Sequence, residues 1–512
     1  MSGNRRDFIR FVVAGAVAAG CPIDLSLLAA PMESAPSVEG EDNKICHQVR
    51  DGKVFSAPPA SAKYDVVIVG GGISGLATAY KLKDRDFLLL EKEPHWGGNA
   101  TLADYNGSIY ATGAAFLDGK EDEGYILARE IGLEPLPIDN WDGTILQQQF
   151  VADTWGDGLD KLPYQPSIKA LFKRFRENML ALDLDKRKEE FWNTPWSSYM
   201  RGYPPEIRQW WDTYGPSNWG ARSEDTAAFI GLYELRQMAA PERNDERYTF
   251  PGGLGAISKK LSEVLESQHK DRMLTSATIV AVENGKSDAR VTYVQGGELK
   301  TVSAKVVIMA TPKFITRRLV QGLPQKQSDA MQEIRYIPYA VVNLIYDKPV
   351  FNVGYDTWCP GNRFTDVIVA DWVIKKQAGY QQKFNILSCY TPMLEEERAQ
   401  LLTETGARKI ASQVLTDFQK LLPNTQVDPR EVHIYRRGHP LYMSAPALYG
   451  KVQPVVREPF ERVIFANTDS EGPVSSTGEA IAAAKRAVQE AEKRMAGSSL
   501  APAPRVEARI PA

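Results

Sequence analysis

The 512-residue sequence has few of the residues that hold common metal and haem sites. It contains four cysteines and five histidines, and these are scattered, with no CxxC, CxxCH or HExxH spacing. Structural zinc, c-type haem and zinc-protease chemistry therefore lack their usual ligand patterns, and we expect no metal site. Gly and Pro number 39 and 32, which excludes collagen-like and low-complexity classes.

The sequence also lacks a charge excess of one sign. Lys and Arg number 61 against 64 Asp and Glu, a formal net charge of −3. This balance provides no basic footprint for nucleic acid, so we expect no nucleic-acid partner. A hydrophobic share of 43% is typical of a globular protein, and the length favours two or three domains at about 150 residues each.

The N-terminal apolar run is too short to span a membrane. Arg5-Arg6 precedes the apolar stretch 11–20, which is half of the about 20 residues that a spanning helix needs. The pattern resembles a twin-arginine signal, which implies export of a folded protein with the Tat translocase as a transient partner. We expect residues 1–30 to be a signal peptide and the protein to be periplasmic or otherwise exported. Cleavage after Ala30 would release it, and cleavage before Cys21 would leave a lipid anchor.

The strongest pattern lies between residues 64 and 91. A β-branched apolar run at 65–69 leads into a GxGxxG motif, a helical face and a second apolar strand at 87–90 that ends in an acid. This order predicts a dinucleotide site, with the pyrophosphate at the helix N-terminus and the acid on the adenosine ribose. The expected cofactor-binding residues here are Gly70, Gly71, Gly72, Ser74, Gly75, Glu91 and Lys92.

Further motifs identify the cofactor as FAD by resemblance. The pair Gly97-Gly98 after the acid, and the small residues 111–115, resemble the FAD-dependent amine oxidoreductase family. The resemblance implies that Gly97 and Gly98 continue the nucleotide cradle, although the pair could also be a plain turn. It implies that Gly113 and Ala114 pass the flavin ring.

A third piece lies near the C-terminus. The strand predicted at 462–465 ends in Asp469, and a helix is expected over 479–492, with Ser475, Ser476 and Thr477 as candidate caps. By the same resemblance, Asp469 binds the ribityl chain; the alternative is a routine last βα unit.

The implied fold class is α/β, with a Rossmann-like FAD-binding domain of discontinuous segments interleaved with an α+β substrate domain. The predicted segments are the signal 1–30, a linker 31–63, FAD-binding parts 64–149, 247–320 and 436–496, substrate-domain parts 150–246 (helical and aromatic-rich) and 321–435, and a disordered tail 497–512.

Several short motifs are similar to those of exported spermidine dehydrogenases. These are residues 45–52, residues 358–361 and the strand that ends in Asp469. The resemblance implies oxidation of an amine or polyamine by hydride transfer from the carbon beside nitrogen to FAD N5. It also leaves haem open, with His47 as one ligand and no second. The strand expected at 340–346 contains no lysine where many amine oxidases hold one, so an electron acceptor other than oxygen is expected.

The region 189–248 is rich in aromatic residues with acids between them, including Asp212, Glu224 and Asp225. Aromatic faces and carboxylates suit a cationic amine, although packing in a helical core explains the same pattern. His439 could take a proton from an ammonium substrate, or it could be structural. The expected substrate-binding residues are Trp210, Trp211, Tyr214, Trp219 and Tyr442.

Two other functions remain open. A flavin desaturase or oxidase of an apolar substrate predicts a long apolar tunnel without an acid-and-aromatic cluster. A flavin-carrying binding protein without turnover predicts a flavin face sealed by side chains. Cys359 and Cys389 could form a disulfide after export.

Overall fold

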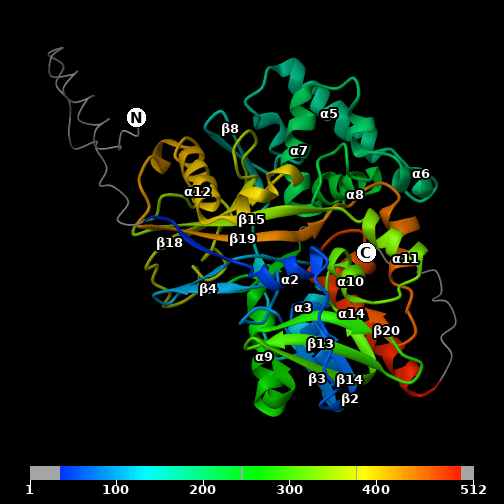
Figure 1. Cartoon of the computed structure of the whole chain (residues 1–512). Coiled ribbons are helices and arrows are strands. Elements are labelled where there is room, and N and C mark those ends of the chain that lie inside the picture. Colours follow the sequence, from blue (N-terminus) through cyan, green and yellow to red (C-terminus); the bar gives the residue numbers. More distant parts are fainter. Residues whose placement is uncertain (1–34, 244–245, 376, 498–512) are drawn as a thin grey trace, which may run out of the picture.

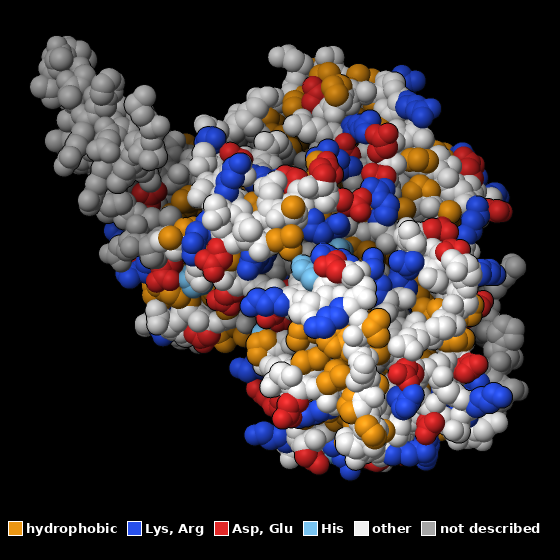
Figure 2. All heavy atoms as spheres, viewed as in Figure 1, with side chains coloured by type: hydrophobic (Ala, Val, Ile, Leu, Met, Phe, Trp, Pro, Cys, Tyr) orange, Lys and Arg blue, Asp and Glu red, His pale blue; other side chains and the backbone are white. Residues whose placement is uncertain are grey.

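The computed structural model describes residues 35–243, 246–375 and 377–497. Two sheets, each assembled from segments far apart in the chain, form two lobes of the molecule (Figure 1). The predicted signal peptide, its cleavage sites, the anchor at Cys21 and all but the first residue of the predicted tail lie outside the described residues. Basic and acidic side chains are intermixed over the face that Figure 2 views.

The first sheet contains the predicted dinucleotide strands. Its order is β11-β3-β2-β14-β13-β12, with β20 paired to β14. Neighbours from β11 to β14 run parallel, as does β20, whereas β12, β13 and the start of β14 are antiparallel. The side chains of 66–69 are fully buried, because a central parallel strand is covered on both faces. The bounds are β2 Lys63–Val69, β3 Phe87–Leu90, β11 Met273–Leu274, β12 Ala277–Glu283, β13 Ala289–Gln295, β14 Glu298–Met309 and β20 Val463–Phe465.

Helices cover one face of this sheet and form its larger core. Helix α3 (Ile73–Lys81) packs against α9 (Gly255–His269) and α14 (Thr477–Met495), and α14 also contacts α4 (Glu123–Glu130). The predicted C-terminal helix is therefore present. Of its three candidate caps, Ser476 is the one that acts, since its side chain accepts a hydrogen bond from the Glu479 N–H at 3.1 Å.

The second sheet has the order β1-β19-β15-β18-β17-β16-β8-β9. Helix α12 (Glu404–Phe418) buries its apolar face against this sheet. The bounds are β1 Ser37–Gly40, β8 Gly143–Leu146, β9 Gln149–Ala152, β15 Tyr336–Tyr346, β16 Asp356–Trp358, β17 Asp366–Val369, β18 Asn385–Pro392 and β19 Glu431–Tyr442.

A helical unit joined to this sheet contains the aromatic-rich region. Its core consists largely of tryptophan, phenylalanine and tyrosine side chains. The helices are α5 Pro166–Leu180, α6 Lys188–Asn193, α7 Pro205–Trp219 and α8 Ala228–Ala239. Short elements complete the fold: α2 Lys44–Arg50, β4 Leu102–Tyr105, β5 Ser108–Ala111, β6 Leu117–Asp118, β7 Leu136–Ile138, β10 Arg247–Thr249, α10 Lys313–Leu319, α11 Gln325–Glu333 and α13 Gln453–Val456.

Three expected segment boundaries need correction. The expected linker 31–63 contains an edge strand, β1, that pairs in parallel with β19, and the helix α2. The expected FAD-binding parts include 143–149 and 436–442, but these residues belong to the second sheet. Sequence patterns mark a strand, whereas its sheet is decided by pairing partners that are distant in the chain.

Two further features concern membranes and disulfides. No helix in the described ranges is long and apolar enough to cross a bilayer. Cys359 and Cys389 are both buried in the second lobe as free thiols, so the structure contains no disulfide between them.

Candidate active site

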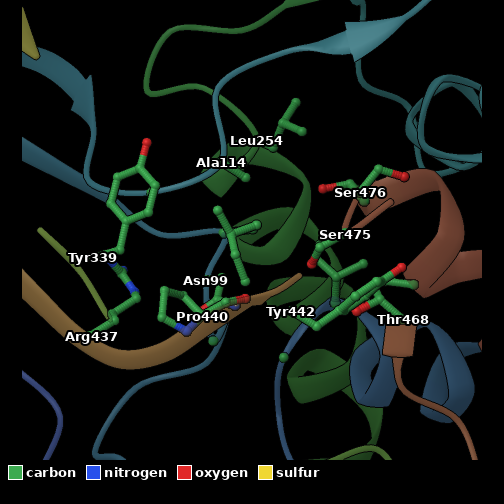
Figure 3. Close-up of a pocket in the computed structure, with 18 of the residues that line it drawn as sticks. Asn99, Ala114, Leu254, Tyr339, Arg437, Pro440, Tyr442, Thr468, Ser475 and Ser476 are labelled. Atoms are coloured by element: carbon green, nitrogen blue, oxygen red, sulfur yellow. The ribbon is translucent and has the colours of Figure 1, made fainter. Parts of the chain in front are cut away.

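A cavity of about 2830 Å³ runs between the two lobes. Ligand pockets commonly measure about 300–1,000 Å³, so this volume leaves room for a dinucleotide and a substrate together. Its wall includes Gly70 and Gly98 from the N-terminal segment, Leu254 from the middle segment and Thr468 from the C-terminal one (Figure 3). The three predicted cofactor segments therefore converge on one site.

The glycine loop divides into residues that build it and residues that face the cavity. A Cβ on Gly75 would lie 1.8 Å from the Gly70 carbonyl oxygen, and one on Gly71 would lie 2.5 Å from the Trp96 ring. Neither glycine lines the cavity, so the expectation that they touch the cofactor is corrected: they allow close packing within the loop. Gly70, Gly72 and Ser74 do line it.

The acid after the second strand lies at the base of this loop. Glu91 accepts hydrogen bonds from the Gly71 N–H at 2.5 Å and the Glu93 N–H at 2.8 Å, and burial raises its pKa. Lys92 forms an ion pair with Glu93. Although burial opposes it, the carboxylates of Glu41 and Glu93 raise the pKa of Lys92 overall. Both predicted residues line the cavity.

The second glycine pair is part of the cradle and not a plain surface turn. Gly97 forms a bridge with Gly72 and donates its N–H to the Gly71 carbonyl at 2.9 Å. Gly97 and Gly98 have φ values of +118° and +57°, which favour glycine. Further along, a Cβ on Gly113 would lie 2.0 Å from the Asn99 carbonyl oxygen. These glycines and Ala114 all line the cavity.

The donors around the cavity fit a dinucleotide such as FAD. Helix α3 has no side-chain cap at its N-cap residue Gly72, and the first turn of α14, which packs against α3, also lines the cavity, so two helix N-termini border one site. Ser74 and Ser258 line the cavity, and their buried hydroxyls have no hydrogen-bond partner among the described residues. Buried hydroxyls normally find a partner, and a diphosphate or ribose would supply one.

Asp469 does not occupy the predicted position on the ribityl chain. Its carboxylate is fully buried and accepts hydrogen bonds from the Lys313 Nζ at 2.6 Å, the Lys313 N–H at 2.8 Å and the Tyr336 hydroxyl at 2.5 Å. It does not line the cavity, whereas Thr468 and Glu471 do. Asp469 forms its ion pair with Lys313 at the start of α10. No sequence signal links residues 313 and 469.

His439 lines the cavity but is a weak proton acceptor there. Its ring stacks on Phe314 with centroids 4.1 Å apart. Burial and the charge of Arg398 lower its pKa to about 4. The charges that act on it also include those of Glu41 and His47. The geometry therefore does not support His439 as the catalytic base.

The aromatic residues expected to bind the substrate divide between the cavity wall and the core. Trp210, Tyr214, Trp219 and Tyr442 line the cavity, whereas Trp211 is fully buried in the helical core. Core packing is thus the correct interpretation for Trp211. Tyr214 stacks on Trp210 at 5.2 Å and lies 4.4 Å from Trp358, measured between ring centroids.

Sequence reasoning missed the acids that face these rings. We name as the acid chamber the cavity-lining carboxylates of Asp118, Asp142, Glu234, Asp356 and Asp366. Arg247 pairs with Asp142 at 2.8 Å, and Tyr214 donates to Glu234 at 2.7 Å. The Asp356 Oδ1 atom is buried and has no hydrogen-bond partner among the described residues. These acids come from three strands, a loop and a helix that are far apart in the chain, so no sequence spacing reveals them.

Burial and nearby acids raise the pKa of three members of the acid chamber, Asp118, Asp356 and Asp366. Burial raises the pKa of Asp366 to about 7, and burial with the nearby charge of Asp366 raises that of Asp356 well above its usual value. The acids singled out from the sequence lie elsewhere. Asp212 and Glu224 pair with Arg208, and Asp225 pairs with Arg335, on the outer surface.

Comparison with known proteins assigns a family to this architecture. The profile of the flavin containing amine oxidoreductases matches residues 73–491. Oxidoreductase PigB of Serratia sp. is 23% identical over 82% of this chain and 73% of its own length, and amine oxidase B of Cavia porcellus is 24% identical over 51% and 52%. A putrescine oxidase variant and cyclohexylamine oxidase from Brevibacterium oxydans share the fold, with TM-scores of 0.66 and 0.65. Each is 16% identical over 85% of this chain and 99% of its own.

Proposed function

This chain belongs to the flavin containing amine oxidoreductase family, and from that premise we propose that it oxidises a cationic amine, polyamines included. The family implies FAD as the cofactor and gives no support for haem. The acid chamber is the observation that carries the choice of substrate, because it opens onto the same cavity as the cofactor cradle.

The acid chamber suits a ligand with positive charge. Its carboxylates outnumber the guanidinium of Arg247 within it, and one oxygen of Asp356 has no hydrogen-bond partner among the described residues. Because burial favours the protonated form of Asp356, a bound ammonium group would supply the missing partner and favour the ionised form. The rings of Trp210, Tyr214 and Trp358 add faces that attract cations.

The chamber adjoins the stretch expected to pass the flavin. Tyr390 donates its hydroxyl to the Gly113 carbonyl at 2.7 Å, and Tyr355 donates to the Ala115 carbonyl at 3.2 Å. Asp366 lies close enough to Tyr390 to raise the pKa of that phenol, after the larger effect of burial. An amine held by the chamber would therefore lie beside the cofactor.

A proton must leave the ammonium before the carbon beside nitrogen can give up a hydride, and bound FAD supplies the acceptor for that hydride. Asp366 can accept the proton, because its pKa of about 7 keeps both forms populated near neutral pH. Aromatic walls hold the substrate and exclude water, which favours hydride transfer over side reactions.

The two alternative functions fit the cavity less well. An apolar substrate would face uncompensated carboxylates in the acid chamber, which desolvation makes unfavourable. A carrier without turnover predicts a sealed flavin face, but the cavity measures about 2830 Å³. The resemblance to protoporphyrinogen oxidases keeps the apolar substrate as the second candidate to be tested.

Anaerobic reduction tests the proposal. Purified protein is mixed with spermidine, putrescine or cyclohexylamine, and the visible flavin absorbance is followed. We expect bleaching by at least one amine and at least tenfold slower bleaching in Asp356→Asn at subsaturating amine. The matched control Glu396→Gln removes an exposed acid and should match wild type. Flavin that no amine bleaches would remove the amine proposal.

We also propose export through the Tat system and an electron acceptor other than oxygen. The basis for export is the Arg5-Arg6 motif, and that for the acceptor is the absence of lysine from the strand 340–346. Fusion of residues 1–34 to a reporter should direct it to the periplasm, and Arg5→Lys with Arg6→Lys should prevent this. Oxygen should reoxidise the reduced protein at least tenfold more slowly than an artificial quinone; equal rates would refute the second proposal.

A further inference from the structure

Arg437 is a cavity-lining cation that is held by uncharged groups. It lies on β19 opposite Tyr339 of β15, and its remaining exposed surface faces the cavity. Its guanidinium donates to the Thr112 carbonyl and to the Thr101 hydroxyl, both at 2.6 Å. Among the described residues, no carboxylate forms an ion pair with it at 4.0 Å or less.

Two other cations of the cavity wall differ in this respect, whereas Arg398 and Arg436, which also line it, donate to backbone carbonyls as Arg437 does. Arg247 is paired with Asp142 at 2.8 Å, and Lys92 is paired with Glu93. For Arg437, burial lowers the pKa, and the more distant Glu41 opposes that shift. The guanidinium remains protonated at any ordinary pH, because its reference pKa exceeds about 12. The protein therefore maintains a buried positive charge that forms no direct ion pair with a carboxylate of the described residues.

The position of this charge relative to the cofactor cradle is clear. The Nη2 atom lies 3.5 Å from where a Cβ on Gly113 would be. Asn99, which shapes the same stretch, donates its side-chain amide to the Pro440 carbonyl at 2.8 Å. Figure 3 shows Arg437 beside Asn99 and Pro440 on the wall of the pocket that Ala114 also lines.

We propose that Arg437 is the fixed positive charge that stabilises the reduced form of the bound flavin. The inference rests on FAD binding and not on the identity of the amine. When the amine transfers a hydride, it loses two electrons and one proton and becomes an iminium, and the flavin gains one negative charge. No further reactant is needed. A preorganised cation in a poorly solvated site stabilises such a charge more strongly than water does.

Redox titration of the holoprotein tests this role without any amine. The midpoint potential of bound FAD is measured against reference dyes in wild type, Arg437→Gln and Arg437→Lys. We expect the Gln variant to favour the reduced flavin at least tenfold less, a fall of about 30 mV for a two-electron couple. The Lys variant should recover at least half of that shift, because it keeps the charge. The dissociation constant for sulfite, an anion that adds to flavin, should rise at least tenfold in the Gln variant alone.

Two outcomes would overturn the role. One is equal potentials and equal sulfite affinities in wild type and a flavin-loaded Gln variant. The other is a midpoint potential of the bound flavin in wild type that is equal to or lower than that of free FAD. This second outcome can be measured even if the Gln variant loses FAD. A normal shift in potential combined with no bleaching by any amine would leave this inference standing and remove the proposed substrate.

Discussion

A side chain at position 72 should block cofactor binding without unfolding the protein. Gly72 has φ −72° and ψ −177°, an extended conformation that any residue adopts. The nearest heavy atom to a Cβ placed there is the Gly98 Cα at 3.7 Å, an ordinary contact. Gly72→Ala should therefore change the free energy of unfolding of the apoprotein by less than about 1 kcal/mol.

The effect on cofactor binding should be much larger. Gly72 precedes the first turn of α3, where the free N–H groups would bind the pyrophosphate. In Gly72→Val two methyl groups would occupy that approach. Loss of two hydrogen bonds to a charged group, at about 1.5–3 kcal/mol each, amounts to about 3–6 kcal/mol. This corresponds to roughly 10²- to 10⁴-fold weaker binding of FAD.

The assay compares FAD content and the apoprotein Tm across matched glycine variants. Gly450→Ala is the neutral control, since a Cβ there meets nothing within 4 Å. Gly75→Ala should lower both quantities, because its Cβ would lie 1.8 Å from a carbonyl oxygen. Full FAD content in Gly72→Val would refute the placement of the pyrophosphate. A loss of apoprotein Tm in Gly72→Val equal to that in Gly75→Ala would refute the inference that position 72 affects cofactor binding and not folding.

Two further predictions concern buried charges. Burial raises the pKa of Asp366 to about 7, so the folded state favours the protonated form of this carboxyl group. The contribution of Asp366 to the free energy of unfolding is therefore full at acid pH and is lost as the pH rises through about 7. The apoprotein Tm of Asp366→Asn, relative to wild type, should therefore rise between pH 5 and pH 8, and a constant difference would contradict this. Lys313→Met leaves Asp469 buried without its cation, so urea unfolding should show a loss of about 3–5 kcal/mol, while Lys313→Met with Asp469→Leu should recover much of it. An equal loss of unfolding free energy in the single and the double variant would contradict the pairing of Lys313 with Asp469.

Local patterns predicted the dinucleotide half of the fold well. The strand at 87–90 has the expected bounds, the helix expected over 479–492 lies within α14, and the glycine pair 97–98 has the positive φ values of a tight turn. Short-range chemistry decides such features: a buried parallel strand needs an apolar run, and a tight turn needs glycine. The limits of the two lobes were predicted less well, because β1 and β8 join the second sheet through partners hundreds of residues away.

The candidate site divides in the same way. The glycines of the loop and the acid after the second strand have a spacing that is typical of dinucleotide-binding turns, so Gly72 and Glu91 could be identified from the sequence. Asp469 was misplaced because its neighbours along the chain carry no sign of Lys313. The acid chamber was missed because its acids lie far apart in the chain, on three strands, a loop and a helix, and no motif links them.

By itself the sequence determined that a dinucleotide loop exists, which family it resembles and that three distant segments contribute to one cofactor site. Only the tertiary structure decided which carboxylates line the cavity, which are neutralised elsewhere and which of the described cations have no ion pair. The reason is physical. Backbone conformation depends on neighbouring residues, whereas the energy of a buried charge depends on every group within a few ångströms, whatever its position in the chain.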